Sequence, residues 1–183
     1  MSLDCPDEGH RRKLDEVTEA PDEPEYLALL KEALESYPNS IVRLNSPHPI
    51  ARYTCGLHAF GFTEDPEYVR IAGRPFNRIV AGPAFVEWLI ENELLTEVTA
   101  AQSSEGALVV YFNEEGQVRH LGLKLAGHRV ESKWGTCDLF QHEVFELPKA
   151  YGSSVRFFRR LPYEDAMTYF KRFAKENGML FVD

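Results

Sequence analysis

The sequence predicts an α+β protein in which helices pack on an antiparallel sheet of about four to six strands. Three observations predict this class. Apolar residues recur at helical spacing in the first half of the chain, they run continuously or alternate in the second half, and glycine-containing turns separate the segments of that half. Helices and strands that are segregated along the chain are typical of α+β domains. With 183 residues, 44% of them hydrophobic and 27% charged, the chain can form one domain with a substantial core.

The first 24 residues differ in composition from the rest of the chain. Segment 1–24 holds three prolines, few large apolar side chains, and eight acidic against three basic residues. Its net charge of −5 is more than half of the −9 carried by the whole chain. Such a composition favours solvent over a packed core. We therefore expect an acidic, poorly packed arm over 1–24 and a single domain over 25–183.

Periodicity locates the elements of this domain. Helical spacing predicts one helix over 25–37, a second that begins at Gly82-Pro83 and buries a stripe from Phe85 to Leu94, and a closing helix over 163–177. The intervening segment 63–83 is rich in Gly and Pro and is expected to be irregular. Apolar runs and alternation predict four strands, over 107–112, 117–125, 128–134 and 155–160.

Charge and composition argue against several classes of protein. The net charge of −9 disfavours a nucleic-acid binder, because contacts to phosphates require a basic face. No apolar run approaches the length of a membrane span, and the acidic start of the chain is unlike a secretory signal, so we expect a cytoplasmic protein. Three cysteines do not suggest a disulfide framework. We expect no cofactor, and the oligomeric state stays open.

Cys55 is the first candidate for a reactive group. Tyr53 and Thr54 before it favour an extended backbone, and the following Gly-Leu-His-Ala-Phe can form a short helix, which would place Cys55 at a helix start. The amide groups and dipole of a helix N-terminus lower the pKa of a thiol and can hold an oxyanion. The alternative is a buried, inert cysteine, the commonest state of a single cysteine.

His120 is the candidate base. Alternation along its predicted strand puts His120 and Gly122 on one face, and a glycine beside a histidine leaves room for another backbone or for a substrate. A cysteine on a helix followed in the sequence by a histidine on a strand is the order used by papain-like enzymes. The alternative is a half-exposed histidine without a catalytic role.

The block from Ala107 to Gly135 resembles the second half of an NlpC-type papain-like peptidase. Over residues 46–161 the chain is similar to an uncharacterised bacterial family of NlpC-like proteins. The matching motifs are Thr54-Cys55-Gly56-Leu57-His58-Ala59, His120, Ser132-Lys133-Trp134-Gly135, Tyr151-Gly152 and Phe157-Phe158-Arg159-Arg160. This resemblance implies a papain-like fold in which Cys55 is the nucleophile and His120 the base.

The third, orienting member of such a catalytic set falls near Ser132, and Glu131 or Gln141 are alternatives for that role. The residue before the cysteine is Thr54, where the family has Asn or Asp. We assign substrate contacts to three further residues: His58 beside the nucleophile, Lys133 near a substrate carboxylate, and Trp134 as a wall of the cleft. The alternatives are a solvated Lys133, a core Trp134, and a packing role for His58.

Three functions follow as hypotheses. The first is a cysteine hydrolase of the peptidase or amidase type that acts on a small peptide, amide or ester. The second is a catalytically inactive interaction domain of the same fold. The third is a zinc-stabilised domain, since zinc accepts two Cys and two His as tetrahedral ligands. Its ligands would be Cys55, His58, Cys137 and His142.

Overall fold

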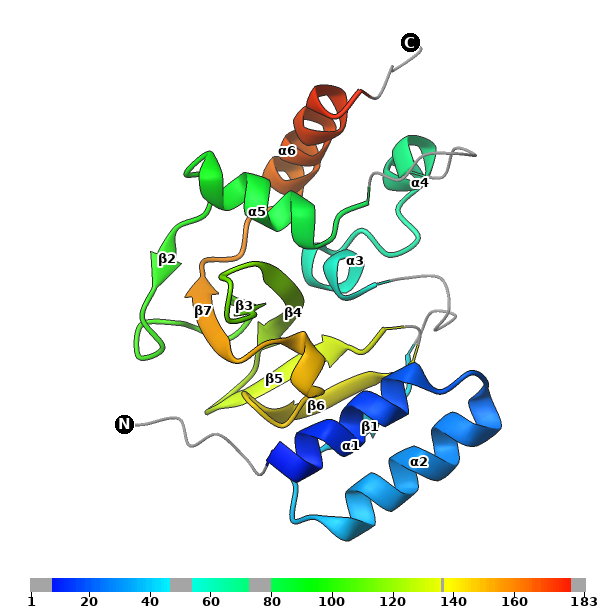
Figure 1. Cartoon of the computed structure of the whole chain (residues 1–183). Helices are drawn as coiled ribbons and strands as arrows, with labels where there is room; N and C mark the ends of the chain where they lie inside the picture. Colours follow the sequence, from blue (N-terminus) through cyan, green and yellow to red (C-terminus); the bar gives the residue numbers. More distant parts are fainter. Residues whose placement is uncertain (1–7, 47–53, 73–79, 136, 179–183) are drawn as a thin grey trace.

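The structure is a computed structural model that describes residues 8–46, 54–72, 80–135 and 137–178. Within these residues the chain forms six α-helices and one antiparallel sheet of seven strands in the order β1-β6-β5-β4-β3-β7-β2 (Figure 1). The predicted α+β class is thus confirmed, with one strand more than the upper end of the expected range. The strands are β1 (Val42–Leu44), β2 (Glu97–Val98), β3 (Leu108–Phe112), β4 (Val118–Lys124), β5 (Arg129–Lys133), β6 (Leu139–Glu143) and β7 (Ser154–Phe158).

The predicted helices are present close to their expected bounds. They are α2 (Glu23–Ser36), α5 (Pro83–Glu91) and α6 (Tyr163–Glu176), and the short helix expected at Cys55 is α3 (Cys55–Phe60). Helix α2 begins two residues earlier than predicted, because the side chain of Asp22 caps it by accepting from the amide of Glu25 at 3.0 Å. Part of the segment expected to be irregular forms α4 (Pro66–Ala72).

Helices cover both faces of the sheet, and each face has its own core (Figure 1). The upper core lies between the sheet and helices α3, α4, α5 and α6; it includes Leu57, Tyr68, Phe85, Val110, Leu121 and Phe170. The lower core lies between the sheet and a pair of N-terminal helices; it includes Leu14, Tyr26, Val109, Tyr111, Trp134 and Phe140. Val109 and Val110 point to opposite cores, as the alternation of a strand requires.

The N-terminal segment differs from its predicted state. Residues 8–19 form helix α1 (Glu8–Glu19), which pairs with α2 and buries Leu14 and Val17 completely in the lower core. Only four residues of α1 are buried, at the spacing of one helical face, while most of the other residues are charged. Because the acidic composition hides this narrow stripe, the prediction of a poorly packed arm was wrong for residues 8–19; residues 1–7 lie outside the described part.

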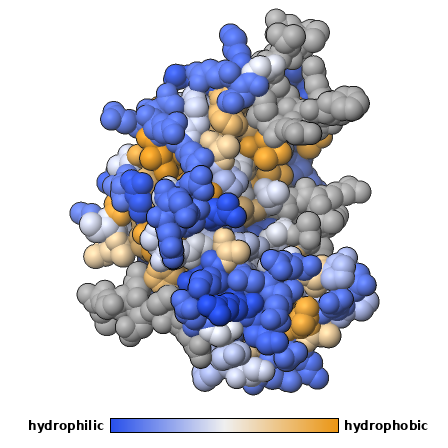
Figure 2. Space-filling view, in the orientation of Figure 1, coloured by the Kyte–Doolittle hydropathy of each residue, from blue (hydrophilic) through white to orange (hydrophobic). Residues whose placement is uncertain are grey.

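The two halves of the surface differ in polarity. Figure 2 shows mainly hydrophilic residues over α1 and α2, and most of the exposed hydrophobic residues in the half that contains α3 to α6. None of the helices in the described part of the chain combines the length and the apolar character that a membrane-spanning helix requires.

Candidate functional site

Cys55 is the first residue of helix α3, as the sequence predicted. Thr54 caps the helix: its backbone is extended, and its hydroxyl oxygen accepts from the amide of Leu57 at 3.5 Å. Gly56 brings the helix start against a neighbouring segment, since a Cβ atom there would lie 1.7 Å from the carbonyl oxygen of Ala81. The first turn of α3 is therefore fixed by a cap and by a backbone contact that only glycine permits.

The helix start lies where β4 and β5 separate. These strands pair at Leu123 with Glu131 and at Lys124 with Val130. In the same register Leu121 would face Lys133, two positions further along, but the ladder does not extend to that pair. Helix α3 packs against both strands. The Cys55 thiol interacts with the backbone of Leu121 and with the charge of Lys133. Cys55 thus occupies the fork between the two strands, beside the backbone that carries His120.

Two opposing influences set the pKa of the Cys55 thiol. Burial raises the pKa, and hydrogen bonds from the backbone of Leu121, Gly56 and Cys55 itself lower it, as does the charge of Lys133. The net result is a raised pKa. The helix amides act in the predicted direction, but loss of solvent outweighs them. At neutral pH the thiol is therefore protonated and requires a base.

His120 lies on β4 directly opposite Tyr111 of β3 and is 2% exposed. Burial is the main cause that lowers the pKa of His120 well below its usual range, and the neighbouring His142 and His58 lower it further. The imidazole is therefore neutral at physiological pH and able to accept a proton. Its Nε2 atom is buried and makes no hydrogen bond to any residue in the described part of the chain.

The space beside Gly122 is filled by protein. A Cβ atom at Gly122 would lie 2.5 Å from the side chain of Val130 and 3.0 Å from the carbonyl oxygen of Glu131. Of the two occupants that the sequence left open, another backbone or a substrate, the structure has the backbone of β5. This close approach brings Glu131 and Ser132 toward α3 and β4.

Tyr151 is the neighbour that fixes the ring of His120. The two rings stack with their centroids 4.1 Å apart and their planes inclined by 17°. Tyr151 ends a 3₁₀ helix (Lys149–Tyr151), and Gly152 follows with φ of 129°, where a Cβ atom would lie 2.6 Å from the carbonyl oxygen of Phe112. The resemblance included the Tyr-Gly pair, but no local pattern predicted that Tyr151 packs against the histidine.

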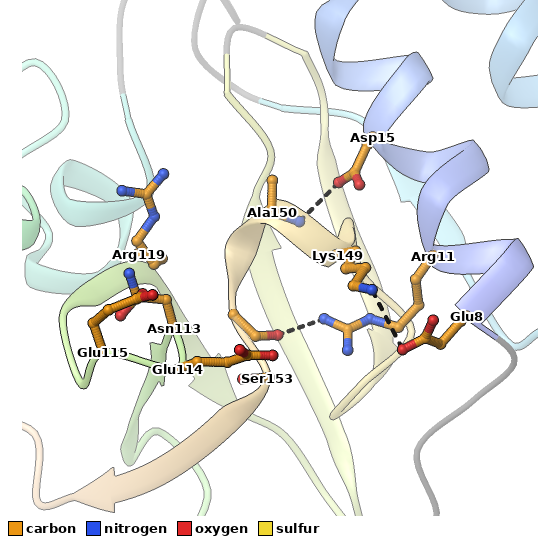
Figure 3. Close-up of a pocket in the computed structure, with 11 residues that line it drawn as sticks. Glu8, Arg11, Asp15, Asn113, Glu114, Glu115, Arg119, Lys149, Ala150 and Ser153 are labelled. Carbon is orange, nitrogen blue, oxygen red and sulfur yellow. Dashed lines mark hydrogen bonds and ion pairs between the residues drawn. The ribbon is translucent and has the colours of Figure 1, made fainter.

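Helix α1 holds the 3₁₀ segment that carries Tyr151 (Figure 3). Arg11, which is 3% exposed, donates to the carbonyl oxygens of Leu147 at 3.1 Å and of Gly152 at 2.5 Å. The carboxylate of Asp15 accepts from the amide of Ala150 at 2.9 Å, and Glu8 pairs with Lys149. Glu8, Arg11, Asp15, Lys149 and Ala150 line one side of a cavity of about 510 Å³, with Arg119 and the turn at Asn113 on its other side.

Glu131, one of the residues predicted to orient His120, contacts another histidine. Its carboxylate lies 3.1 Å from Nε2 of His58 and also accepts from the side-chain amide of Gln141 at 3.4 Å. His58 lies one helical turn beyond Cys55 on α3. The contacts from Gln141 of β6 through Glu131 of β5 to His58 therefore end beside the candidate nucleophile. The hydrogen bond to His58 lowers the pKa of Glu131.

Ser132, the first of the three residues predicted to orient His120, also contacts a different histidine. Its hydroxyl lies 2.8 Å from Nε2 of His142, and the indole N–H of Trp134 donates to the same hydroxyl oxygen at 3.1 Å. Nδ1 of His142 lies 2.7 Å from the carbonyl oxygen of Glu143, which can only accept, so Nε2 accepts from Ser132. Ser132, Trp134 and His142 are each 0% exposed. They form a satisfied buried network.

The two predicted substrate contacts that follow Ser132 are buried as well. Trp134 stacks on Phe140 in the lower core, with ring centroids 4.2 Å apart, which agrees with the core alternative for this residue. Lys133 is 0% exposed, and its ammonium donates to the carbonyl oxygens of Gly135, at 2.9 Å, and Cys137. Burial lowers the pKa of Lys133 to about 8. Lys133 therefore faces the interior near Cys55.

The structure does not bring the four proposed zinc ligands together as a metal site. Across the described residues, which include Cys55, His58, Cys137 and His142, no group of three or more His, Cys, Asp or Glu side chains is arranged to hold a metal ion. Both ring nitrogens of His142 are occupied by Ser132 and Glu143. His58 contacts Glu131.

Comparisons of this chain with family models, with curated proteins and with solved structures find no match.

Proposed function

We propose that this chain is a cysteine hydrolase of papain-like fold in which Cys55 is the nucleophile and His120 the general base. The observation that carries the proposal is the position of Cys55 in the fork of β4 and β5, with its thiol against the backbone of Leu121, the residue next to His120. A helix that presents a cysteine to an antiparallel sheet with a histidine on a central strand is the arrangement that the NlpC-like resemblance implies. The unpartnered Nε2 of His120 supports this assignment.

The protonation states define the first step. Both groups are neutral at pH 7, because burial raises the pKa of Cys55 and lowers that of His120. The thiol proton moves to Nε2 of His120 as the sulfur attacks the carbonyl carbon of an amide or ester, so that no ion pair has to exist beforehand. Backbone amides at the start of α3 stabilise the oxyanion. The imidazolium then protonates the leaving group, and water hydrolyses the acyl-enzyme with His120 again acting as base.

A second candidate is a non-catalytic interaction domain of the same fold. One observation favours it: Glu131 and Ser132, the residues expected to orient the base, contact His58 and His142 instead. Loss of an orienting residue reduces the efficiency of a catalytic histidine severely. In the hydrolase proposal this task falls to the stacked ring of Tyr151.

Trapping of an acyl-enzyme distinguishes the two candidates. The protein is mixed with p-nitrophenyl acetate, release of p-nitrophenol is followed, and peptide mass spectrometry locates any acetyl group. A hydrolase acquires one acetyl group on Cys55. Since a general base typically contributes about 10²–10⁴-fold, His120→Ala is expected to slow this acylation at least about a hundredfold.

Two control variants make the result specific. His128→Ala removes an exposed histidine from the turn before β5 and is expected to leave the rate unchanged. Cys137→Ser removes the other described cysteine, which is buried, and excludes label on that residue. If Cys55 acylates equally fast in the native protein and in His120→Ala, the hydrolase proposal fails and the non-catalytic domain is preferred.

A further inference from the structure

A cavity of about 300 Å³ lies beside the turn that joins β4 to β5. Besides this turn, its lining includes Ala100 and Ala101, which follow β2, and two residues from later in the chain, Val144 and Phe157. Segments far apart in the sequence therefore build the cavity together. Its volume is at the lower end of the range of about 300–1,000 Å³ that is typical of small-molecule sites.

This cavity is separate from the fork that holds Cys55. Strand β5 joins the two places: its first residue, Arg129, lines the cavity, and its last residue, Lys133, lies at the fork. At about 3.3 Å per residue along a strand, the two ends of β5 are about 13 Å apart. A ligand in the cavity would therefore not take part in the chemistry proposed for Cys55.

The floor of the cavity is apolar. Val144 and Phe157 are 4% and 6% exposed and belong to the lower core. Ala100 and Ala101 add small apolar side chains that are exposed. A ligand with an apolar body would remove this surface from water, which favours its binding.

Two basic residues at the ends of the paired strands also line the cavity. Lys124 is the last residue of β4, and its ammonium donates to the carbonyl oxygen of Leu125 at a distance of 3.5 Å. Arg129 donates from Nη2 to the carbonyl oxygen of Ser40 at 3.0 Å. Neither residue forms an ion pair with a carboxylate of the described part of the chain. Neutral carbonyl groups thus hold two positive charges at this end of the sheet.

The described carboxylates on the neighbouring strands leave these charges uncompensated. Glu131 is paired with a histidine of α3. Glu146 accepts from the amide and the hydroxyl of Ser40 and from the amide of Glu143. Glu143 lies opposite Arg129 in the register of β5 and β6, but the two side chains do not pair. An anion at the cavity would therefore be attracted by both basic residues.

We infer that this cavity binds a small monocarboxylate with an apolar body. Its carboxylate lies toward Lys124 and Arg129, and its apolar body covers Val144 and Phe157. Inorganic phosphate would leave the apolar floor exposed to water, and a neutral hydrocarbon would make no use of the positive charges. The inference does not rest on the hydrolase proposal, because the cavity and the fork lie at opposite ends of β5.

Titration with four small molecules tests the class of ligand. Phenylacetate and 4-methylpentanoate are apolar monocarboxylates, and the shifts of the backbone amides of Gly127 and Ala101 in NMR spectra report their binding at the lining. We expect both acids to bind saturably. Phenylacetamide, which lacks the charge, and inorganic phosphate, which lacks the apolar body, should each bind at least tenfold more weakly. Saturable binding of neither acid would overturn the inference, and so would equal binding of phenylacetamide or of phosphate.

Four variants test the position of the ligand. Lys124→Met should weaken binding of phenylacetate at least fivefold, whereas Lys175→Met, at an exposed lysine of α6 outside the lining, should leave it unchanged. Ala101→Trp should abolish binding by filling the cavity, and Ala101→Ser should retain it. Because Lys124 is half-buried and the other positions are exposed, all four variants should fold. Equal affinities within either pair of variants would overturn the inference.

Discussion

The ring of His120 stacks on the ring of Tyr151, with 4.1 Å between the ring centroids and 17° between the planes. The two residues belong to different elements, β4 and the 3₁₀ segment before β7, and the pKa of Tyr151 is raised by burial and, to a smaller extent, by the nearby Cys55. Stacking fixes the plane of the imidazole without forming a hydrogen bond to it. The Nε2 atom of His120 therefore stays available to a proton from the site.

Replacing Tyr151 tests whether stacking orients the base. We expect Tyr151→Leu to slow acylation of Cys55 by p-nitrophenyl acetate about tenfold, since an aromatic pair contributes about 0.5–1.5 kcal/mol. Tyr151→Phe keeps the ring and is expected to retain most of the rate. A histidine NMR spectrum gives an independent readout, because the ring-current shift of His120 disappears only in Tyr151→Leu. Equal rates in the two variants would exclude an orienting role for the ring.

Helix α1 supports the same segment through Arg11, whose donors reach three backbone carbonyl groups between Leu147 and Gly152. We expect Arg11→Met to lower the free energy of unfolding by about 3 kcal/mol, because it leaves buried carbonyl groups without donors. Urea unfolding measures this change. Arg12→Met is the matched control: Arg12 is the next residue, its side chain is 66% exposed, and its pairing with Glu8 should contribute little. Similar losses in both variants would contradict a specific role of Arg11.

These contacts also show what the sequence could and could not predict. The helix start at Cys55 and the strand at His120 were predictable, because capping and alternation are local properties. Arg11 supports the segment of Tyr151 in part through Gly152, which lies 141 positions further along the sequence. No local sequence pattern predicts such a contact. The roles of Glu131 and Ser132 differ from the expectation for a similar reason. Both residues lie on the predicted strand, but their partners come from other elements: Glu131 contacts His58 of α3, and Ser132 contacts His142 of β6.

Ser132 offers a test of the buried network. We expect Ser132→Ala to destabilise the protein by about 2–4 kcal/mol, because Nε2 of His142 and the indole N–H of Trp134 both lose their buried partner. Acylation of Cys55 should continue at the wild-type rate at a temperature where the variant is folded. Ser104→Ala, at an exposed serine, is the control for stability. A large loss of acylation in a folded Ser132→Ala protein would instead restore Ser132 as a catalytic residue.

Lys133, at the end of β5, is expected to promote ionisation of Cys55. Its positive charge lowers the pKa of the thiol, so Lys133→Met should raise that pKa further and slow acylation severalfold at neutral pH. The rate is measured from pH 6 to pH 10, and the rising limb of the profile should move to higher pH in the variant. Lys31→Met, at a side chain that is 74% exposed on α2, should leave the profile in place. An unchanged profile in Lys133→Met would show that its charge does not reach the thiol.

His142 makes stability dependent on pH in a defined window. Burial lowers the pKa of His142 to about 4, from 6.5 in the unfolded chain, so the unfolded protein binds the proton more readily between these values. This contribution to stability is fully present above pH 6.5 and is lost as the pH falls toward 4. At 1.36 kcal/mol for each pKa unit, His142 alone should remove about 2 kcal/mol between pH 7.5 and pH 5. Burial also lowers the pKa of His120, which acts in the same direction.

Urea unfolding at several pH values between 7.5 and 5 measures this loss. His142→Gln should be less stable than the wild type at pH 7.5 but should lose less stability on acidification, so that the two proteins converge as the pH falls. The exposed His128 provides the matched variant, His128→Gln, which should follow the wild type throughout. Carboxylates contribute equally to all three proteins, so the difference in slope isolates the imidazole of His142. Parallel curves for wild type and His142→Gln would mean that His142 titrates alike in the folded and unfolded chains, which would contradict its burial as a neutral acceptor for Ser132.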